Sequence, residues 1–407
     1  MDRYCPLPFM HIFNDSTNQF DMCCHANTKM SASKNLRTKW NVTKDLPFDF
    51  FFSDDMQALR NKMNNNEYVD ACNRCYEMDK LNVPSPRKMH LHQQGRLNNI
   101  GKVEIKLRMF GSYCNLSCYM CHPNHSSGRR NDLKSLGYDL KDFGYNIIPE
   151  RHNKISYEKM ENHILNNLEH INKIIILGGE PLQVKKFYEF LDKFPDKYAK
   201  SIYIAISTNL SKIEFKGHKL EDYIKRFHRL AITISADHFM EKEEWIRWPI
   251  NFNEFEDNIN YINQVISDYS PNYRYVNSSS YPSIGRYKGG RRRPTYPMLV
   301  TPTVSVLNVD DLEDIFEYYR TLNLSVGQYS FQYVEYPKHV QPHLHIEAPR
   351  IIEKYMGTEF EPVSLRMKNE LEKSSKKEIE KQRNNLKEYL DRLSALRGDW
   401  RKLWGTV

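Results

Sequence analysis

The chain has 407 residues, of which 40% are hydrophobic and 27% charged, as in an ordinary globular protein of two or three domains or of one large barrel with additions. Its formal net charge of +8 attracts anions only weakly when spread over this length. Apolar runs such as residues 174–177 are far shorter than the roughly 18 residues of a membrane-spanning helix, which excludes such helices.

The first six residues do not have the basic and apolar layout of a secretory signal, so we expect a cytoplasmic protein that does not contact a membrane. Eight cysteines are too few to staple a domain of this size with disulfides, and in a reducing compartment clustered cysteines more often bind metal. All eight lie within the first 121 residues. Their clustering therefore carries the information about function.

The N-terminal group of cysteines consists of Cys5, Cys23, Cys24, Cys72 and Cys75. The last two have the C-x2-C spacing of common metal-binding knuckles. Together with the upstream cysteines they can hold either zinc or an iron–sulfur cluster, and the residues themselves leave both open.

Three further cysteines, Cys114, Cys118 and Cys121, form a C-x3-C-x2-C motif that directly follows a segment typical of a strand, 103–109. Three thiolates on one short loop can each bind a different iron of a [4Fe-4S] cube. The fourth iron is then left for a distant ligand or for a substrate. The alternative is a zinc site completed by His122 or His125.

Apolar periodicity predicts that strands and helices alternate along the rest of the chain. The expected strands are 103–109, 174–177, 202–206, 230–234, 299–307 and 326–334. The expected helices between them are 160–171, 187–194, 223–227, 255–266 and 312–319. Six strands separated by helices are the pattern of parallel βα units wound as a barrel, and functional groups in such a barrel lie at the C-terminal ends of the strands.

Small and polar residues follow three of these strands. They are Gly178, Gly179 and Glu180 after the second strand, Ser207 and Asn209 at the end of the third, and Asp237 after the fourth. Paired glycines let the backbone approach a ligand closely, and the carboxylate after them can accept hydrogen bonds from a cationic amine.

The three-cysteine motif after the first strand and the Gly-Gly-Glu motif after the second resemble the radical S-adenosylmethionine (SAM) superfamily. The family pattern is C-x3-C-x-Φ-C, in which Φ is usually aromatic; here it is Met120, which is large and apolar and can still shield a cluster. The resemblance implies an α/β fold with a partial TIM barrel of (β/α)6 type. It also implies that Cys114, Cys118 and Cys121 hold a [4Fe-4S] cluster whose open iron binds SAM.

The same resemblance assigns the SAM contacts. Gly178, Gly179 and Glu180 would receive the methionine amine, and Ser207, Asn209 and Asp237 would contact ribose or carboxylate. The implied activity is reductive cleavage of SAM to a 5′-deoxyadenosyl radical, which abstracts a hydrogen from a substrate. An external electron donor of flavodoxin or ferredoxin type would supply the electron. The protein's task is to hold the reacting carbon against one C–H bond.

The N-terminal cysteines resemble the auxiliary-cluster segment of radical SAM proteins with a twitch or SPASM domain. That segment begins C-x9-15-G-x4-C. Cys5 and Cys23 have this spacing, and Asn18 stands at the position of the glycine. Asparagine tolerates the same left-handed turn as glycine. Residues 51–60 resemble the helix that precedes the C-x2-C pair. The implied ligands of an auxiliary [4Fe-4S] cluster are Cys5, Cys23, Cys72 and Cys75. Cys24 is left over as a small buried residue or as an exchange partner of Cys23.

Relatives with twitch or SPASM extensions often modify ribosomally made peptides, so a peptide or protein is the first substrate hypothesis. The second is a nucleotide, a nucleic acid or a small metabolite, because tyrosines and arginines such as Arg291, Arg292 and Arg293 alternate in segment 268–297. That segment can equally be an exposed loop without function. The third hypothesis is a non-catalytic metal-binding or Fe-S protein.

The sequence thus divides into an auxiliary-cluster domain at 1–98, a radical SAM barrel at 99–340 and a C-terminal helical extension at 341–407. Apolar residues at 386, 390, 393, 400 and 403 form a narrow stripe. They predict a helix that packs on the barrel or, as the alternative, binds a partner.

Overall fold

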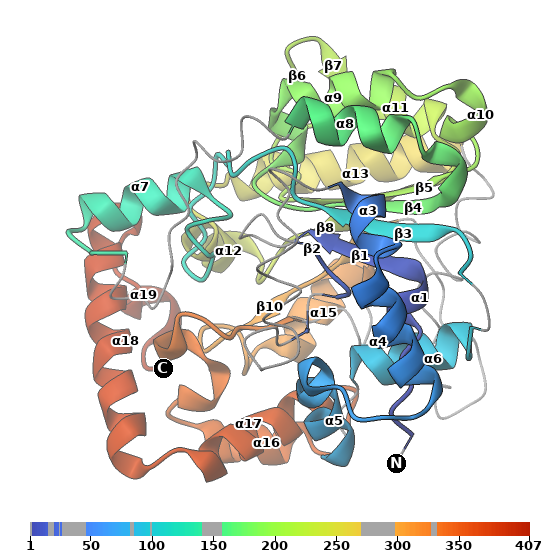
Figure 1. Ribbon diagram of the computed structural model, residues 1–407. Coiled ribbons are helices and arrows are strands. Elements are labelled where there is room, and N and C mark those ends of the chain that lie inside the picture. Colours follow the sequence, from blue (N-terminus) through green and yellow to red (C-terminus); the bar gives the residue numbers. More distant parts are fainter. Residues whose placement is uncertain are drawn as a thin grey trace.

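The computed structural model describes residues 2–14, 20–23, 25–26, 46–81, 85–97, 100–140, 157–269, 298–326 and 332–407. Cys24, Asn18 and residues 270–297 of the predicted tyrosine and arginine segment lie outside this part of the chain. Figure 1 shows the N-terminal helices (blue) on one side of the molecule and the C-terminal helices (red) on the other, with strands between them.

The main sheet contains eight strands among the described residues, in the order β11-β9-β8-β5-β4-β3-β1-β2. Their bounds are β1 (His11–Asn14), β2 (Phe20–Asp21), β3 (Val103–Leu107), β4 (Ile171–Ile176), β5 (Tyr203–Thr208), β8 (Leu230–Ile234), β9 (Met298–Val300) and β11 (Ser325–Val326). All neighbours pair in parallel except β1 and β2, which are antiparallel. The predicted parallel α/β architecture is confirmed, and the six expected strands lie side by side in sequence order.

The described parts of two expected strands pair in two different sheets. The segment 299–307 forms β9 and then β10 (Thr303–Val304), separated by Pro302, which cannot donate to a ladder. The segment 326–334 forms β11 and β12 (Gln332–Tyr333), and β12 pairs with β10 in a separate small sheet. A further hairpin, β6 (Glu214–Phe215) with β7 (His218–Lys219), has no counterpart in the sequence prediction.

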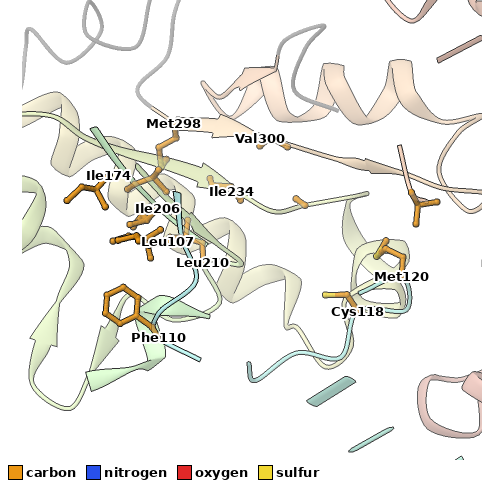
Figure 2. Packing of buried hydrophobic residues seen from close by; sticks show 14 of the residues in the cluster. Leu107, Phe110, Cys118, Met120, Ile174, Ile206, Leu210, Ile234, Met298 and Val300 are labelled. Carbon is orange, nitrogen blue, oxygen red and sulfur yellow. The ribbon is translucent and has the colours of Figure 1, made fainter. Parts of the chain in front are cut away.

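The core of the sheet is built from branched and other apolar side chains on neighbouring strands. In Figure 2 the side chains of Leu107, Ile174, Ile206 and Met298, from four different strands, gather in one group. Each of them is fully buried. Burial of such residues along each strand fixes the register of the sheet, because a shift by one residue would turn them to the other face.

The expected helices that connect the strands are present. They are α8 (Tyr157–Leu165), continued by the 3-10 turn η3 (Leu168–His170), α9 (Lys185–Asp192), α11 (Leu220–Arg226), α13 (Phe252–Tyr269) and α15 (Leu312–Thr321). Shorter elements complete the connections: α7 (Ser127–Ser135), η4 (Pro181–Gln183), α10 (Asp196–Ala199) and α12 (Met240–Ile246).

The described part of the N-terminal region is mostly helical. It contains α1 (Leu7–Met10), α3 (Pro47–Phe51), α4 (Asp54–Asn64), η1 (Asp70–Cys72), α5 (Asn73–Lys80) and α6 (Pro86–Gln94). Ser53 caps α4 by accepting a hydrogen bond from Met56 N, as a residue of its type does at a helix start. The strand β1 of this region joins the main sheet, with Ile12 opposite Ile105 of β3.

The C-terminal region contains η5 (Lys338–Val340), η6 (Pro342–Leu344), α16 (Ala348–Tyr355), α17 (Glu361–Lys373), α18 (Lys376–Arg397) and α19 (Arg401–Trp404). The predicted helix over 386–403 is interrupted, because α18 ends at Gly398, whose φ of 85° favours glycine. Leu386, Leu390 and Leu393 are buried, so α18 packs on the rest of the protein as predicted. Among the described residues, no helix is long and apolar enough to cross a membrane.

Candidate functional site

The loop that carries Cys114, Cys118 and Cys121 connects the C-terminal end of β3 to α7. Cys118 is buried, and the other two cysteine residues are partly exposed. Burial raises the pKa of all three thiols, and the nearby Cys118 raises the pKa of Cys114 and Cys121 further, the latter to about 12. The three predicted cluster ligands lie on this one loop. Binding of iron would favour their thiolate forms.

The backbone of this loop is held by the end of α12 and the residues that follow it. Ser117 N donates to Trp248 O at 2.6 Å, and Tyr119 N donates to Ile246 O at 3.0 Å. These two bonds lie on either side of Cys118. Met120, at the Φ position of the motif, is buried beside Cys118 in Figure 2, so it can shield a cluster as predicted.

The carbonyl groups of the same loop are held by α7 and α18. Arg129 of α7 donates from Nη2 to Tyr119 O at 2.9 Å, and the Tyr389 hydroxyl of α18 donates to the same oxygen. Arg397 at the end of α18 donates to Ser117 O. Figure 1 shows α18 running along one side of the molecule towards α7. The C-terminal helix thus supports the three-cysteine loop, a role that its apolar stripe did not reveal.

The paired glycines pack directly against the start of the cysteine loop. A Cβ at Gly179 would lie 1.9 Å from Tyr113 O, and one at Gly178, whose φ is +110°, would lie 3.1 Å from Gly111 O. Glu180 N donates to Tyr113 O at 2.6 Å. Because glycines have no side chain, the backbone at the end of β4 packs closely against the backbone of the cysteine loop.

Glu180 is 2% exposed, and both of its carboxylate oxygens accept hydrogen bonds from the protein. Oε1 accepts from Thr208 Oγ1 at 2.7 Å and from Leu182 N at 3.1 Å, and Oε2 accepts from Asn209 N at 2.6 Å. Burial raises the pKa of Glu180 to about 7, against the effect of these donors. The carboxyl group therefore ties the C-terminal ends of β4 and β5 together.

Asn209 connects this edge of the sheet to the first cysteine. Its Nδ2 donates to Asn115 Oδ1 at 3.0 Å and also points at Cys114 Sγ, 3.8 Å away. Ser207 lies two residues earlier in the chain and is partly exposed. The sequence did not single out Thr208, which lies between these two predicted residues and makes the bond to Glu180.

Asp237 is fully buried and forms an ion pair with Arg247, with Oδ2 and Nη2 2.7 Å apart. Its Oδ1 accepts from Thr303 N at 2.6 Å. Arg247 also pairs with Glu243 at 3.3 Å, and its Nη1 donates to Cys118 Sγ at 3.5 Å. Asp237 thus reaches the cysteine loop through an arginine that the sequence prediction missed, because no local motif marks it.

The four cysteines predicted to hold an auxiliary cluster line one cavity in the N-terminal region. The lining residues that matter here are Cys5, Cys23, Cys72, Cys75, His25 and Arg87. Burial raises the pKa of Cys5 to about 12, and the neighbouring Cys75 adds to this effect. The buried Nδ1 of His25, a residue that was assigned no role, has no hydrogen-bond partner among the described residues.

The side chains at the cysteine loop and at the N-terminal cavity suit iron–sulfur clusters. Thiolates bind the irons of such a cluster, and its sulfurs accept hydrogen bonds from N–H groups. The three-cysteine loop has two such donors directed at its sulfurs, and the N-terminal cavity has four thiols and an unpartnered imidazole nitrogen. In the described part of the chain, no group of three or more His, Cys, Asp or Glu side chains is arranged to hold a single metal ion.

A protein-family model matches the part of the chain that contains this site. Residues 109–274, which include the cysteine loop and the ends of β4, β5 and β8, match the family model described as the Radical SAM superfamily. A search of curated proteins gives no match.

A search of the solved structures gives native anSMEcpe with bound AdoMet, at 16% identity over 56% of this chain and 50% of that one, with a TM-score of 0.33. Streptococcus suis SuiB bound to the precursor peptide SuiA shares 13% identity over 75% of this chain and 51% of that one, with a TM-score of 0.34. TYW1 with a lysine-pyruvate adduct bound shares 13% identity over 74% and 82%, with a TM-score of 0.32. The chain therefore spans about half the length of the first two.

The family match covers the three-cysteine motif, the paired glycines and the arginine that contacts Cys118. The match assigns residues 109–274 of the chain to the Radical SAM superfamily.

Proposed function

We propose that Cys114, Cys118 and Cys121 hold a [4Fe-4S] cluster and that SAM binds its open iron at the C-terminal edge of the sheet. One observation carries this proposal: three neighbouring thiols lie on a loop whose backbone is fixed from two sides. When bound, the cluster and SAM supply reductive cleavage of SAM and abstraction of a hydrogen from substrate, as in the family.

The predicted SAM contacts are the second part of this proposal. Gly178, Gly179 and Glu180 adjoin the start of the cysteine loop, and Asn209 reaches Cys114, which supports a binding place between these strand ends and the cluster. Ser207 and Asp237 are proposed for the same site. Asp237 also holds Arg247 in place, because its Oδ2 forms an ion pair with the guanidinium.

We further propose that Cys5, Cys23, Cys72 and Cys75 hold an auxiliary [4Fe-4S] cluster. Their arrangement around one cavity supports this assignment. Four protein ligands would leave no iron of this cluster open, which favours electron relay or structural support over direct substrate binding.

The proposed substrate class is a peptide or protein, as the resemblance to radical SAM proteins with a twitch or SPASM extension implies. Peptides encoded beside the gene are the first candidates to incubate with reduced enzyme and SAM. A mass change in the peptide, detected by mass spectrometry, is the expected result. Modification of RNA, of a nucleotide or of a small metabolite, with peptides unchanged, would contradict this substrate class.

The cluster assignments are tested by metal analysis of anaerobically reconstituted protein. We expect about eight irons per chain, four for each cluster, and release of 5′-deoxyadenosine when reduced protein meets SAM. Cys118→Ser should lose about half of the iron and all SAM cleavage, whereas Cys75→Ser should lose the other half and still bind SAM. Zinc in place of iron, or SAM cleavage by Cys118→Ser, would overturn the proposal.

A further inference from the structure

We propose that Arg247 is a positioning residue that donates an N–H···S hydrogen bond to Cys118 and thereby raises the reduction potential of the SAM-binding cluster. The inference rests on the proposed function, since it requires that Cys118 be a cluster ligand. It assigns a task to a buried cation that neither sequence motif includes.

Backbone geometry places Arg247 opposite Cys118. The residues on either side of Arg247, Ile246 and Trp248, accept hydrogen bonds from the residues on either side of Cys118, Tyr119 and Ser117. The two segments therefore run antiparallel for three residues, with Arg247 and Cys118 as the central pair. This pairing brings the guanidinium within 3.5 Å of the sulfur.

Two carboxyl groups hold the guanidinium in this position. Asp237 follows β8, and Glu243 lies one helical turn before Arg247 on α12. Glu243 is itself held, because its Oε2 accepts hydrogen bonds from the backbone N–H groups of Asp237 and His238 at 3.0 and 2.7 Å. A planar guanidinium can serve both carboxylates and the sulfur at once, which an ammonium on a flexible stem cannot do.

The effect on the cluster follows from charge. Reduction adds one electron from the external donor and makes the cluster more negative, so a buried cation at a ligand sulfur stabilises the reduced form more than the oxidised form. Hydrogen bonds to the sulfurs are among the factors that set the potential of Fe-S clusters. Loss of the guanidinium is therefore expected to make the cluster harder to reduce.

The test is a redox titration followed by electron paramagnetic resonance, without SAM, on full-length protein carrying Cys75→Ser so that one cluster signal remains. In the Arg247→Gln variant we expect the ratio of reduced to oxidised cluster at a fixed solution potential to fall about tenfold, which is about 59 mV for one electron. Tyr389→Phe is the matched control, because it removes a hydrogen bond to the same loop without changing a charge or a contact to sulfur. Its midpoint is expected to equal that of the parent protein.

The outcomes separate this inference from the proposed function. If the parent protein binds no cluster at Cys118, the proposed function fails. If the cluster is bound and Arg247→Gln leaves the midpoint unchanged, only the inference is overturned. Should Arg247→Gln fail to hold a cluster, Arg247→Lys is measured instead: a smaller shift in the same direction supports the proposal, and an unchanged midpoint overturns it.

Discussion

Gly179 shows how a single residue determines the shape of the site. The backbone of the cysteine loop occupies the space where its side chain would be, and the same contact gives Tyr113 O a hydrogen-bond donor in Glu180 N. A methyl group here would push the loop away from the end of β4.

We therefore expect Gly179→Ala to lower the free energy of unfolding by about 1 to 3 kcal/mol, the usual cost of forcing extra atoms into a packed place. The iron bound at the cysteine loop should fall as well, because the loop would be displaced. Gly101→Ala is the matched control: a Cβ there meets nothing within 4 Å. Urea unfolding and iron analysis measure both effects, and equal stability of the two variants would contradict this account of Gly179.

The residues of the site divide into those that a sequence can reveal and those that it cannot. The cysteines and the paired glycines lie in short motifs, whose resemblance to a known family predicted a common site, and the structure packs Gly179 against the start of the cysteine loop. Arg247 and Arg397 reach the same loop from other parts of the chain. Tertiary packing brings these two arginines to the loop, and no periodic pattern in the sequence predicts the contact.

At the scale of elements, one buried carboxylate on β3 contacts both neighbouring strands. Glu104 on β3 is buried, and its carboxylate lies 3.1 Å from Lys173 Nζ on β4 and 3.5 Å from His11 Nε2 on β1. Burial alone would raise the pKa of Glu104, but Lys173 and then His11 outweigh it and lower the pKa from 4.5 to about 2.

A carboxyl group with a lowered pKa in the folded state stabilises the protein above its unfolded pKa and loses this effect as the pH falls. The contribution of Glu104 should therefore be present above about pH 4.5 and decline towards pH 2, with a total of about 3 kcal/mol. Glu104→Gln should be less stable than wild type at pH 6, and the difference should shrink at pH 3. Urea unfolding at both pH values measures it, with the exposed Glu169→Gln as control. A difference independent of pH would refute the assignment.

The elements differ in how well the sequence predicted them. The strands of the barrel are apolar runs or alternating segments bounded by helices, and Leu230–Ile234 matches its predicted range. The strand β1 has only four residues, and all of them are buried, so it shows no alternation of the kind that marks a half-exposed strand. The apolar stripe at 386–403 predicted one helix, because a glycine inside a helical pattern is often tolerated, whereas Gly398 ends α18.

At the scale of the whole molecule, the N-terminal region and the barrel share one sheet. The strand β1 pairs with β3 over three residues, in parallel, and β2 then forms the edge. Without β1 the backbone groups of β3 on that side would have no strand partner in the main sheet. The boundary at residue 98 thus separates segments that are joined by backbone hydrogen bonds.

This shared sheet predicts that the two regions unfold together. Ile12 on β1 is fully buried opposite Ile105, so Ile12→Ala should cost about 2 to 5 kcal/mol through the cavity that it leaves. Four of the five tryptophans, Trp245, Trp248, Trp400 and Trp404, lie far along the chain from this strand, so their fluorescence reports on the barrel and its C-terminal helices. If unfolding is cooperative, Ile12→Ala should shift the urea midpoint of tryptophan fluorescence by as much as that of far-UV circular dichroism. A fluorescence midpoint that stays at the wild-type value would contradict this prediction. The N-terminal region would then fold as a separate unit, and the loss of Ile12 would change only its part of the circular dichroism signal.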